Sequence, residues 1–411
     1  MIDVIRSKGA IHMSLTLSQK AKSVKPSSTL AITAKAKEMK EKGIDVVGFG
    51  AGEPDFNTPD NICNAAMKAI REGFTKYTPA SGTNELKEAI CKKFKTFNNL
   101  EYTPSQIVIS NGGKHGLSNV FDAILNPGDE VIIPAPYWLS YPEMVKLSDG
   151  IPVYITGSKE QGYKVTAQQI REAVTDKTKA LVLNTPSNPT GMIYTRKELE
   201  EIAAVAVECD FYVVSDEMYE HLTYGEEHVS IASLNEEIYK RTITCSGMSK
   251  SYAMTGWRIG YTASSVEIAK LMSAMQSHAT SNPNSIAQKA ALEALIGSQD
   301  QVKYMCQAFD SRRVHMFERI SKMPLISCIE PKGAFYVFID LADAIGKNYK
   351  GEVIADAAKF AEILLRDFAV AVIPCADFGF ADHIRLSYAI SIEQINKGLD
   401  RIEEFLSLLE A

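Results

Sequence analysis

Lys250 is the residue of this sequence whose surroundings best suit covalent chemistry. It follows a short apolar stretch and lies between Ser249 and Ser251, with Ser246 shortly before it. Arg258 follows eight residues after Lys250. Most lysines are solvated surface groups, so the position alone favours a surface role. A lysine amine can nevertheless form an imine with an aldehyde. Whether Lys250 does so depends on the polar groups that the rest of the sequence places near it.

Polar groups also follow three other apolar stretches of the chain. They are Asn111-Gly112-Gly113-Lys114 after Ile107–Ser110, Asn188-Pro189-Thr190-Gly191 after Ala180–Leu183, and Asp216 with Tyr219 after Phe211–Ser215. A glycine pair that opens a helix could bind phosphate on backbone N–H groups, but alone it more often marks a turn. The Asn188 segment alone also indicates a turn. Asp216 is explained about equally well as a helix cap or as a ligand to a buried cation.

The apolar stretches alternate with helical patterns from about residue 60 to about residue 290, which indicates an α/β layer. The candidate strands are Ile107–Ser110, Glu130–Ile133, Ala180–Asn184, Phe211–Ser215, Thr242–Cys245 and Arg258–Thr262. Because they are nearly all apolar, we expect helices on both faces of a largely parallel sheet. Ligands gather beyond the carboxyl ends of such strands, so the polar groups should meet at one edge.

Taken together, these groups suit a phosphorylated aromatic aldehyde. Lys250 would form an imine, Asp216 would keep a pyridinium nitrogen protonated, and nearby donors would bind the phosphate. A competing motif, Gly48-Phe49-Gly50-Ala51-Gly52, is similar to a dinucleotide-binding fingerprint. It fails because Glu53 stands where the third glycine is needed, and Pro54-Asp55 follows instead of a helix. A nicotinamide-dependent dehydrogenase is therefore a weak alternative.

The composition argues against several classes of protein. Among 411 residues there are 44 Lys and Arg against 50 Asp and Glu, a net charge of −6. This balance argues against nucleic acid or an anionic membrane as the main partner. No apolar run reaches the ~18 residues of a membrane span. The seven cysteines are scattered without a CxxC pair, so we expect neither a metal site nor disulfides, and a reducing cytoplasm as the compartment.

The length favours two or three lobes. Residues 1–13 are expected to be a leader, disordered or vector-derived, because Asp3 interrupts their apolar stretch and Met13 could be the true start. We predict an N-terminal arm and part of a small domain in residues 14–57. Residues 58–300 should form a large cofactor-binding domain, and residues 301–411 a smaller α+β domain.

Several stretches together carry a resemblance to a known family. They are Val24–Ser28, Gly50–Phe56, Lys76–Gly82, Asn111–Lys114, Pro136–Trp138, Ser187–Gly191, Ser215–Glu220, Ser249–Gly260 and Ile384–Tyr388. Through them the sequence resembles the class I/II aminotransferases of pyridoxal-phosphate (PLP) fold type I, most closely the bacterial-type aspartate aminotransferases. The resemblance implies a large domain with a mostly parallel sheet flanked by helices, plus a small α+β domain built from both chain ends.

The resemblance also implies how PLP would be bound. Lys250 would hold the cofactor as an imine and move a proton between the substrate and the cofactor, while Asp216 would pair with the ring nitrogen. Asn188 and Tyr219 would hydrogen-bond the phenolic oxygen of PLP, and Trp138 would stack on its ring.

The phosphate of PLP would have several ligands by the same resemblance. Arg258, the backbone at Gly113 and Lys114, and Ser246 or Ser249 would bind it. Tyr77 would reach the phosphate of the neighbouring protomer, which implies a homodimer with shared active sites.

For the substrate, the resemblance implies that Arg385 binds the α-carboxylate, with Gly52, Asn188 and Trp138 beside it. The arginine that binds the distal carboxylate in animal-type enzymes is missing from Ser277–Asn284. In the bacterial-type subgroup a lysine at the position of Lys114 takes that role. Lys25 matches a position associated with prephenate transamination.

We therefore predict a ping-pong aminotransferase that converts L-aspartate and 2-oxoglutarate into oxaloacetate and L-glutamate, with prephenate as a further substrate. A broad aromatic or alanine aminotransferase and a PLP-dependent β-lyase are alternatives. An aminotransferase-like ligand sensor is an alternative from another class, but it would need a fused DNA-binding segment.

Overall fold

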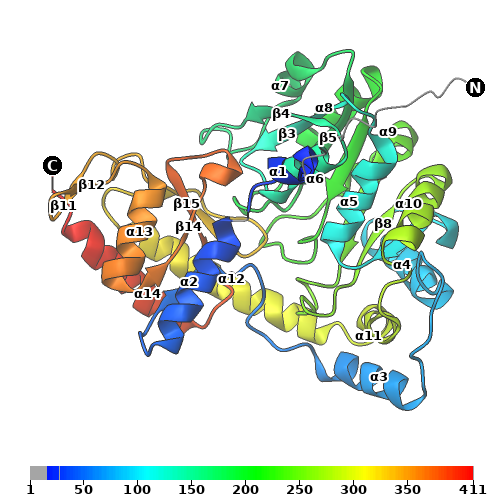
Figure 1. The fold of residues 1–411 in the computed structure, drawn as a ribbon, viewed down its shortest axis with the longest axis horizontal. Helices are drawn as coiled ribbons and strands as arrows, with labels where there is room; N and C mark the ends of the chain where they lie inside the picture. Colours follow the sequence, from blue (N-terminus) through cyan, green and yellow to red (C-terminus); the bar gives the residue numbers. More distant parts are fainter. Residues whose placement is uncertain (1–15, 27, 411) are drawn as a thin grey trace, which may run out of the picture.

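The computed structural model describes residues 16–26 and 28–410, so the expected leader at residues 1–13 lies outside the described residues. The described chain forms two lobes that the long helix α12 (Asp300–Ile320) connects (Figure 1). None of the described helices is long and apolar enough to cross a membrane.

The larger lobe is built on a seven-stranded sheet with the order β2-β8-β7-β6-β5-β3-β4. The strands are β2 (Ile107–Ser110), β3 (Glu130–Ala135), β4 (Ile151–Thr156), β5 (Thr178–Asn184), β6 (Tyr212–Asp216), β7 (Thr242–Gly247) and β8 (Gly260–Ala263). β8 runs antiparallel to both neighbours, and the remaining pairs are parallel. The prediction of a mostly parallel sheet is confirmed.

β4 is a strand that the sequence prediction lacks. It lies at the edge of the sheet, where Ile151 and Tyr154 are 45% and 47% exposed. An edge strand is covered less completely than a central one, so it does not show the all-apolar, deeply buried pattern used to predict the other strands.

Helices cover both faces of this sheet. One face carries α5 (Gly113–Ile124), α6 (Ser140–Leu147) and α10 (Val266–Ala279); the other carries α3 (Asp60–Arg71), α4 (Asn84–Phe97), α7 (Ala167–Ala173), α8 (Arg196–Glu208), α9 (Glu236–Arg241) and α11 (Ser285–Ile296). β2 shows why both layers are needed. Ile107 and Ile109 pack with α4 and α11, whereas Val108 packs with α5. Successive strand residues face opposite sides, so an apolar strand is buried only between two helical layers.

The smaller lobe contains a four-stranded antiparallel sheet with helices packed against it. Its elements are β9 (Ser327–Cys328), β10 (Tyr336–Asp340), β14 (Ile373–Pro374), β15 (His383–Ser387), α13 (Ala357–Phe368) and α14 (Ile392–Ser407), with the small pair β11 (Asn348–Tyr349) and β12 (Glu352–Val353). Phe309, Phe335, Phe360 and Phe405 are fully buried in its core.

Both ends of the chain contribute to the smaller lobe. β1 (Val47–Gly48) pairs in parallel with β13 (Val370–Ala371), and α2 (Ser28–Glu41) packs beside them. α1 (Gln19–Ser23) instead lies against the larger lobe, where Lys20 Nζ donates to Asp149 at 2.8 Å. The N-terminal arm therefore contacts both lobes, while the predicted domain boundaries stay predictions.

Candidate active site

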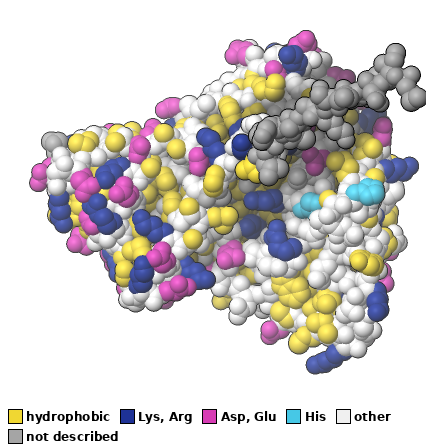
Figure 2. Space-filling view, in the orientation of Figure 1, with side chains coloured by type: hydrophobic (Ala, Val, Ile, Leu, Met, Phe, Trp, Pro, Cys, Tyr) yellow, Lys and Arg dark blue, Asp and Glu magenta, His cyan; other side chains and the backbone are white. Residues whose placement is uncertain are grey.

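One cavity between the lobes brings most of the predicted site residues together. It lies beyond the carboxyl ends of β5, β6 and β7. Its walls include Gly52, Gly113, Lys114, Trp138, Asn188, Asp216, Tyr219, Ser249, Lys250, Arg258 and Arg385. Figure 2 shows Lys and Arg side chains around the hollow on this face of the molecule.

Asp216 ends β6 and lines the cavity with a buried carboxylate. Its Oδ2 accepts a hydrogen bond from the Tyr141 hydroxyl at 2.6 Å, and its Oδ1 accepts one from the Met218 backbone N–H at 3.2 Å. Burial raises the pKa of Asp216 to about 6, although the bond from Tyr141 opposes the shift. Among the described residues no basic side chain forms an ion pair with it, so a cationic ring nitrogen would supply a missing partner.

Lys250 lies in the same cavity, in the turn that follows β7. Its Nζ donates to the carbonyl oxygen of Gly52. Burial lowers the pKa of Lys250 to about 8, and the charges of Arg385 and Arg258 act in the same direction. More of this amine is therefore neutral near pH 8 than in an exposed lysine, which suits a nucleophile.

The start of α5 and the Arg258 side chain form a cradle for an anion. Gly112 caps the helix with φ +87°, and the first N–H groups of a helix, here from Gly113 and Lys114, have no intrahelical partner. A Cβ on Gly112 would lie 2.4 Å from Arg258 Nη2, so the guanidinium lies directly against this turn. Arg258 Nη1 donates to the Thr255 carbonyl oxygen at 2.8 Å.

Arg385 is a buried cation that has no carboxylate partner among the described residues. Its Nη1 donates to Asn188 Oδ1 at 2.9 Å and its Nη2 to the Gly50 carbonyl oxygen at 3.2 Å. The guanidinium lies 4.4 Å from the ring centroid of Tyr336, and its Nε has no hydrogen-bond partner in residues 16–26 and 28–410. Burying a guanidinium without an anion is costly, so this arrangement indicates the position of a ligand carboxylate.

Lys114 is a second cation on the cavity wall. Its Nζ lies 4.9 Å from the ring centroid of Trp138, and no described carboxylate forms an ion pair with it. Burial, and then the charge of Arg258, lower the pKa of Lys114. The charge of an anionic ligand would oppose this lowering and stabilise the ammonium form.

Asn188 and Tyr219 are each in contact with a neighbouring residue that helps to hold them in place. The Asn188 backbone N–H donates to Asn184 Oδ1 at 2.8 Å, and Asn184 Nδ2 donates to the Asp216 carbonyl oxygen at 3.0 Å. The Tyr219 hydroxyl lies 3.0 Å from the Tyr336 hydroxyl. The turn around Asn188 is thereby tied to the end of β6.

Three predicted site residues lie outside the cavity. The sequence prediction names Ser246 or Ser249 for the phosphate, but Ser246 Oγ donates to Glu220 at 2.6 Å inside the protein, so Ser249 is the serine that lines the cavity. Tyr77 is 90% exposed and does not line the cavity of its own chain. Lys25 is exposed, and its backbone N–H donates to Glu143 at 3.3 Å.

Sequence reasoning missed Tyr141, Tyr336 and Asn184. Tyr141 closely follows the Pro136–Trp138 stretch, so its spacing from Trp138 could have indicated it. Tyr336 comes from β10 in the other lobe and has no local pattern that points to the site.

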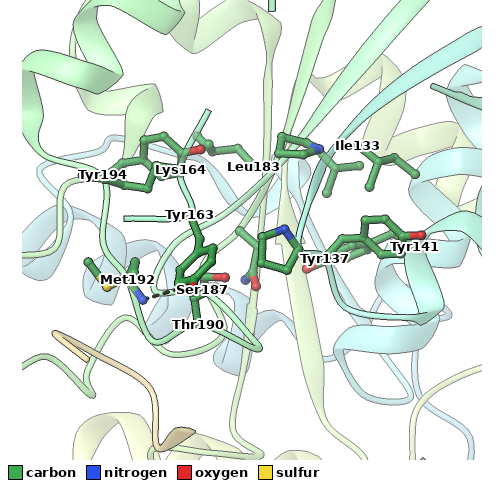
Figure 3. Close-up of a pocket in the computed structure, with 14 residues that line it drawn as sticks. Ile133, Tyr137, Tyr141, Tyr163, Lys164, Leu183, Ser187, Thr190, Met192 and Tyr194 are labelled. Carbon is green, nitrogen blue, oxygen red and sulfur yellow. Dashed lines mark hydrogen bonds between the residues drawn. The ribbon is translucent and has the colours of Figure 1, made fainter. Parts of the chain in front are cut away.

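A second, smaller cavity shares Tyr141 and Asn184 with the first. Figure 3 shows the side chains that line it. It has room for about 30 Å³, and its wall combines hydroxyl groups with apolar side chains such as Ile133 and Leu183. The hydroxyl groups come from Tyr137, Tyr141, Tyr163, Tyr194, Ser187 and Thr190. It contains neither Lys250 nor Asp216, so it does not hold the nucleophile and the buried carboxylate that mark the first cavity.

The family model described as aminotransferase class I and II matches residues 44–402. The chain belongs to this family. An aspartate aminotransferase from a Bacillus species is 52% identical to this aminotransferase over 391 residues, which is 95% of this chain and 99% of that protein. An aspartate/prephenate aminotransferase from Cereibacter sphaeroides is 48% identical over 385 residues, which is 93% of this chain and 96% of that protein.

Solved structures resemble this aminotransferase over nearly its whole length. The aspartate aminotransferase from Rhizobium meliloti has a TM-score of 0.93 with 40% identity, covering 97% of this chain and all of that one. The Thermus thermophilus aspartate aminotransferase with maleate has a TM-score of 0.91 with 42% identity, covering 95% of this chain and all of that one. The resemblance to class I/II aminotransferases and the predicted fold class are confirmed.

Proposed function

We propose that the protein is a PLP-dependent aspartate aminotransferase that exchanges the amino group of L-aspartate with 2-oxoglutarate, giving oxaloacetate and L-glutamate. The observation that carries the proposal is one cavity holding Lys250 and Asp216 together with two cations, Arg385 and Lys114, that lack carboxylate partners among the described residues. An amino-acid substrate with two carboxylates matches both cations.

The residues present fit PLP. The cradle of Gly113, Lys114, Ser249 and Arg258 offers N–H and O–H donors for a phosphate. Asp216 has no cationic partner among the residues that the structure describes, and a pyridinium nitrogen would provide one. When bound, PLP supplies an electron sink for the negative charge that develops at the substrate α-carbon.

The side chains of this protein would then divide the remaining work. Lys250 would bind the cofactor and, once free, take the proton from the α-carbon and return it, because burial lowers its pKa to about 8 and so increases the fraction of neutral amine. Asp216 would hold a proton on the ring nitrogen. Asn188 and Tyr219 would donate to the phenolic oxygen, and Trp138 would stack on the ring. Gly52, whose carbonyl oxygen accepts from Lys250, lies beside the substrate position.

Arg385 would bind the α-carboxylate of the substrate and Lys114 its distal carboxylate. Prephenate also carries two carboxylates, so the same two cations support it as a further substrate, and relatives are named for both activities. Lys25 does not line the cavity, so the support for prephenate comes from these cations instead.

We also infer a homodimer with shared active sites, supported by the exposed Tyr77, and a cytoplasmic enzyme. All seven cysteines are free thiols, which supports a reducing compartment.

The direct test is chemical labelling of Lys250. The purified protein should be yellow, and borohydride should fix the cofactor covalently on Lys250, located by peptide mass spectrometry. Lys250→Ala should still bind PLP through the phosphate and ring contacts but lose turnover. Recovery of the label on another lysine would contradict the assignment. A panel of amino donors with 2-oxoglutarate, pyruvate and prephenate as acceptors would separate the aspartate activity from an aromatic or alanine preference.

A further inference from the structure

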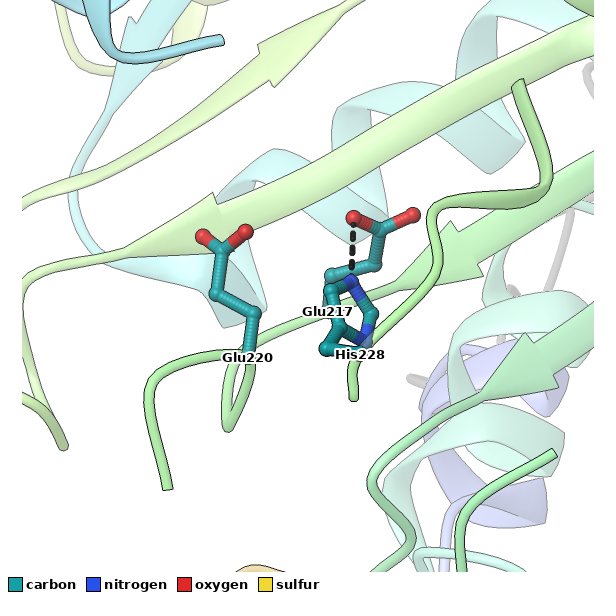
Figure 4. A group of neighbouring side chains, drawn as sticks. All are labelled: Glu217, Glu220 and His228. Carbon is teal, nitrogen blue, oxygen red and sulfur yellow. Dashed lines mark hydrogen bonds and ion pairs between the residues drawn. The ribbon is translucent and has the colours of Figure 1, made fainter. Parts of the chain in front are cut away.

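The turn that carries Asp216 and Tyr219 has a second, fully buried face. Asp216 and Tyr219 line the cavity, whereas Glu217 and Glu220, from the same turn, are 0% and 2% exposed and do not line it. Figure 4 shows these two glutamates with His228. One short turn therefore carries cavity-lining groups on one side and buried carboxylates on the other.

Glu220 joins three segments of the larger lobe. Its carboxylate pairs with the Lys93 ammonium on α4, and it accepts hydrogen bonds from Asn98 Nδ2 at 2.8 Å and from Ser246 Oγ at 2.6 Å. Lys93 itself is 8% exposed. Burial opposes ionisation of Glu220, but the charge of Lys93 lowers the pKa of the carboxyl, so the pair is ionic.

Glu217 ties the same turn to a fourth segment. Its carboxylate accepts hydrogen bonds from Ser215 Oγ at 2.9 Å and Ser230 Oγ at 2.7 Å, and it lies 3.0 Å from His228 Nε2. Glu217, Glu220 and His228 are close enough to ligate a metal ion. The Lys93 ammonium, however, already supplies positive charge at Glu220, so the cluster is explained by contacts within the protein.

Stability alone does not require this buried pair. Replacing a buried ion pair by apolar side chains of similar volume is often neutral or stabilising, so the charges are better explained by the geometry that they impose. Glu220 fixes the turn against Ser246 on β7, and Lys250 follows that strand by a few residues. A misplacement of about 1 Å near a reacting group can cost a hundredfold in rate.

We propose that Lys93 and Glu220 are positioning residues that hold the Tyr219 hydroxyl and Asp216 in register with Lys250. The inference rests on the proposed function, because it concerns the same cavity. Neither residue lines the cavity, so they act through the turn and through Ser246.

The test compares Lys93→Met with Lys93→Met/Glu220→Gln. The single change leaves Glu220 without its cation and should lower Tm by about 5 °C. The double variant should recover most of that loss. Its turnover should nevertheless remain roughly tenfold or more below that of the wild type, with little change in KM. The pH midpoint of the cofactor's visible absorption should also shift, by about one unit.

Two further variants complete the test. Arg171→Met/Glu208→Gln removes a bidentate pair on the surface, remote from the cavity, and should leave turnover and the absorption midpoint at wild-type values. Ser246→Ala removes one hydrogen bond to Glu220 without changing charge, and should shift the midpoint in the same direction as the double variant.

If the double variant has wild-type turnover and an unshifted midpoint, the inference is wrong. Lys93 and Glu220 would then contribute to the stability of the fold alone. If the double variant does not fold, an unshifted midpoint in Ser246→Ala overturns it instead. A wild-type protein without any visible cofactor absorption would contradict the proposed function, not this inference.

Discussion

At the scale of single residues, the cavity is marked by charges without partners. Arg385 and Lys114 have no carboxylate partner, and Asp216 no basic partner, within the part of the chain that the structure describes. Each uncompensated charge costs stability in the free protein, and each matches one charged group of the proposed cofactor or substrate.

Asp216→Asn should stabilise the cofactor-free protein while it disables the enzyme. Because burial raises the pKa of Asp216 from 3.8 to about 6, folding stability should be lost as pH rises from about 4 to about 6. The asparagine removes this loss, so the free energy of unfolding at pH 7 should rise by about 1–3 kcal/mol. Turnover should fall by several orders of magnitude, because the ring nitrogen loses its anionic partner. Urea unfolding of both apoproteins between pH 4 and pH 8 measures the first effect; a variant less stable than wild type at pH 7 would contradict it.

Lys114→Ala should reduce the preference for acidic substrates. Loss of the distal cation should cost about 2–4 kcal/mol in kcat/KM for aspartate and glutamate, because a substrate carboxylate is left unpaired. Alanine, which has no distal carboxylate, serves as the internal control and should react almost as before. Equal losses for acidic and neutral donors would instead assign Lys114 to the cofactor phosphate.

At the scale of elements, the site depends on the ends of strands and the start of one helix. β5, β6 and β7 are parallel neighbours, so Asn184, Asp216 and the segment after Gly247 reach the same edge. α5 begins where β8 passes closely, since a Cβ on Gly260 would lie 2.2 Å from the Gly113 nitrogen. This close contact between the backbones of α5 and β8 helps to place the anion cradle in the same cavity as Lys250.

Gly112→Ala should weaken cofactor binding beyond the cost of backbone strain. Gly112 has φ +87°, and an added Cβ would displace the Arg258 guanidinium. Gly128→Ala is the matched control, because Gly128 has φ +91° and a Cβ added there would meet nothing within 4 Å. Both changes place a side chain on a positive-φ backbone and should cost about 1–3 kcal/mol of stability. Gly112→Ala alone should raise the Kd for PLP roughly tenfold or more, measured by equilibrium dialysis. Equal Kd values in the two variants would show that Arg258 does not depend on this turn.

At the scale of the whole molecule, the cavity exists only because two lobes and the N-terminal arm meet. The larger lobe provides Lys250 and Asp216, the smaller lobe provides Arg385 and Tyr336, and α2 adds Thr29 and Thr33. Tyr77 stays on the surface at 90% exposure, although it is expected to bind a phosphate. A second copy of the chain would reconcile these two facts.

Mixing two impaired variants should restore activity if the sites are shared. In a heterodimer of Lys250→Ala and Tyr77→Phe, one site carries both defects and the other carries neither. Turnover of the mixed and reassembled protein at limiting PLP should therefore exceed that of either variant alone. If Lys250 and Tyr77 of the same chain served the same site, mixing would give no such gain. Analytical sedimentation would test independently whether the protein is a dimer.

The sequence by itself determined which chemistry the protein could perform. Lys250, Asp216 and Asn188 each follow an apolar stretch, and parallel strands bring such ends to one edge of a sheet. Arg258 instead precedes the antiparallel strand β8, whose start lies at the same edge. The helical layers followed from the same stretches, because strands apolar on both faces need two covers. β4 could not be predicted in this way, because a strand at the edge of a sheet needs no all-apolar pattern.

The tertiary structure alone decided which neighbouring side chains reach the cavity. Ser246 and Ser249 are three residues apart, yet Ser246 turns inward to Glu220 while Ser249 lines the cavity. Tyr141 reaches Asp216 from 75 residues away, and Tyr336 reaches Tyr219 from 117 residues away. Local patterns record which face of an element is buried, but not which distant segment packs there, because that pairing depends on how the lobes and layers come together.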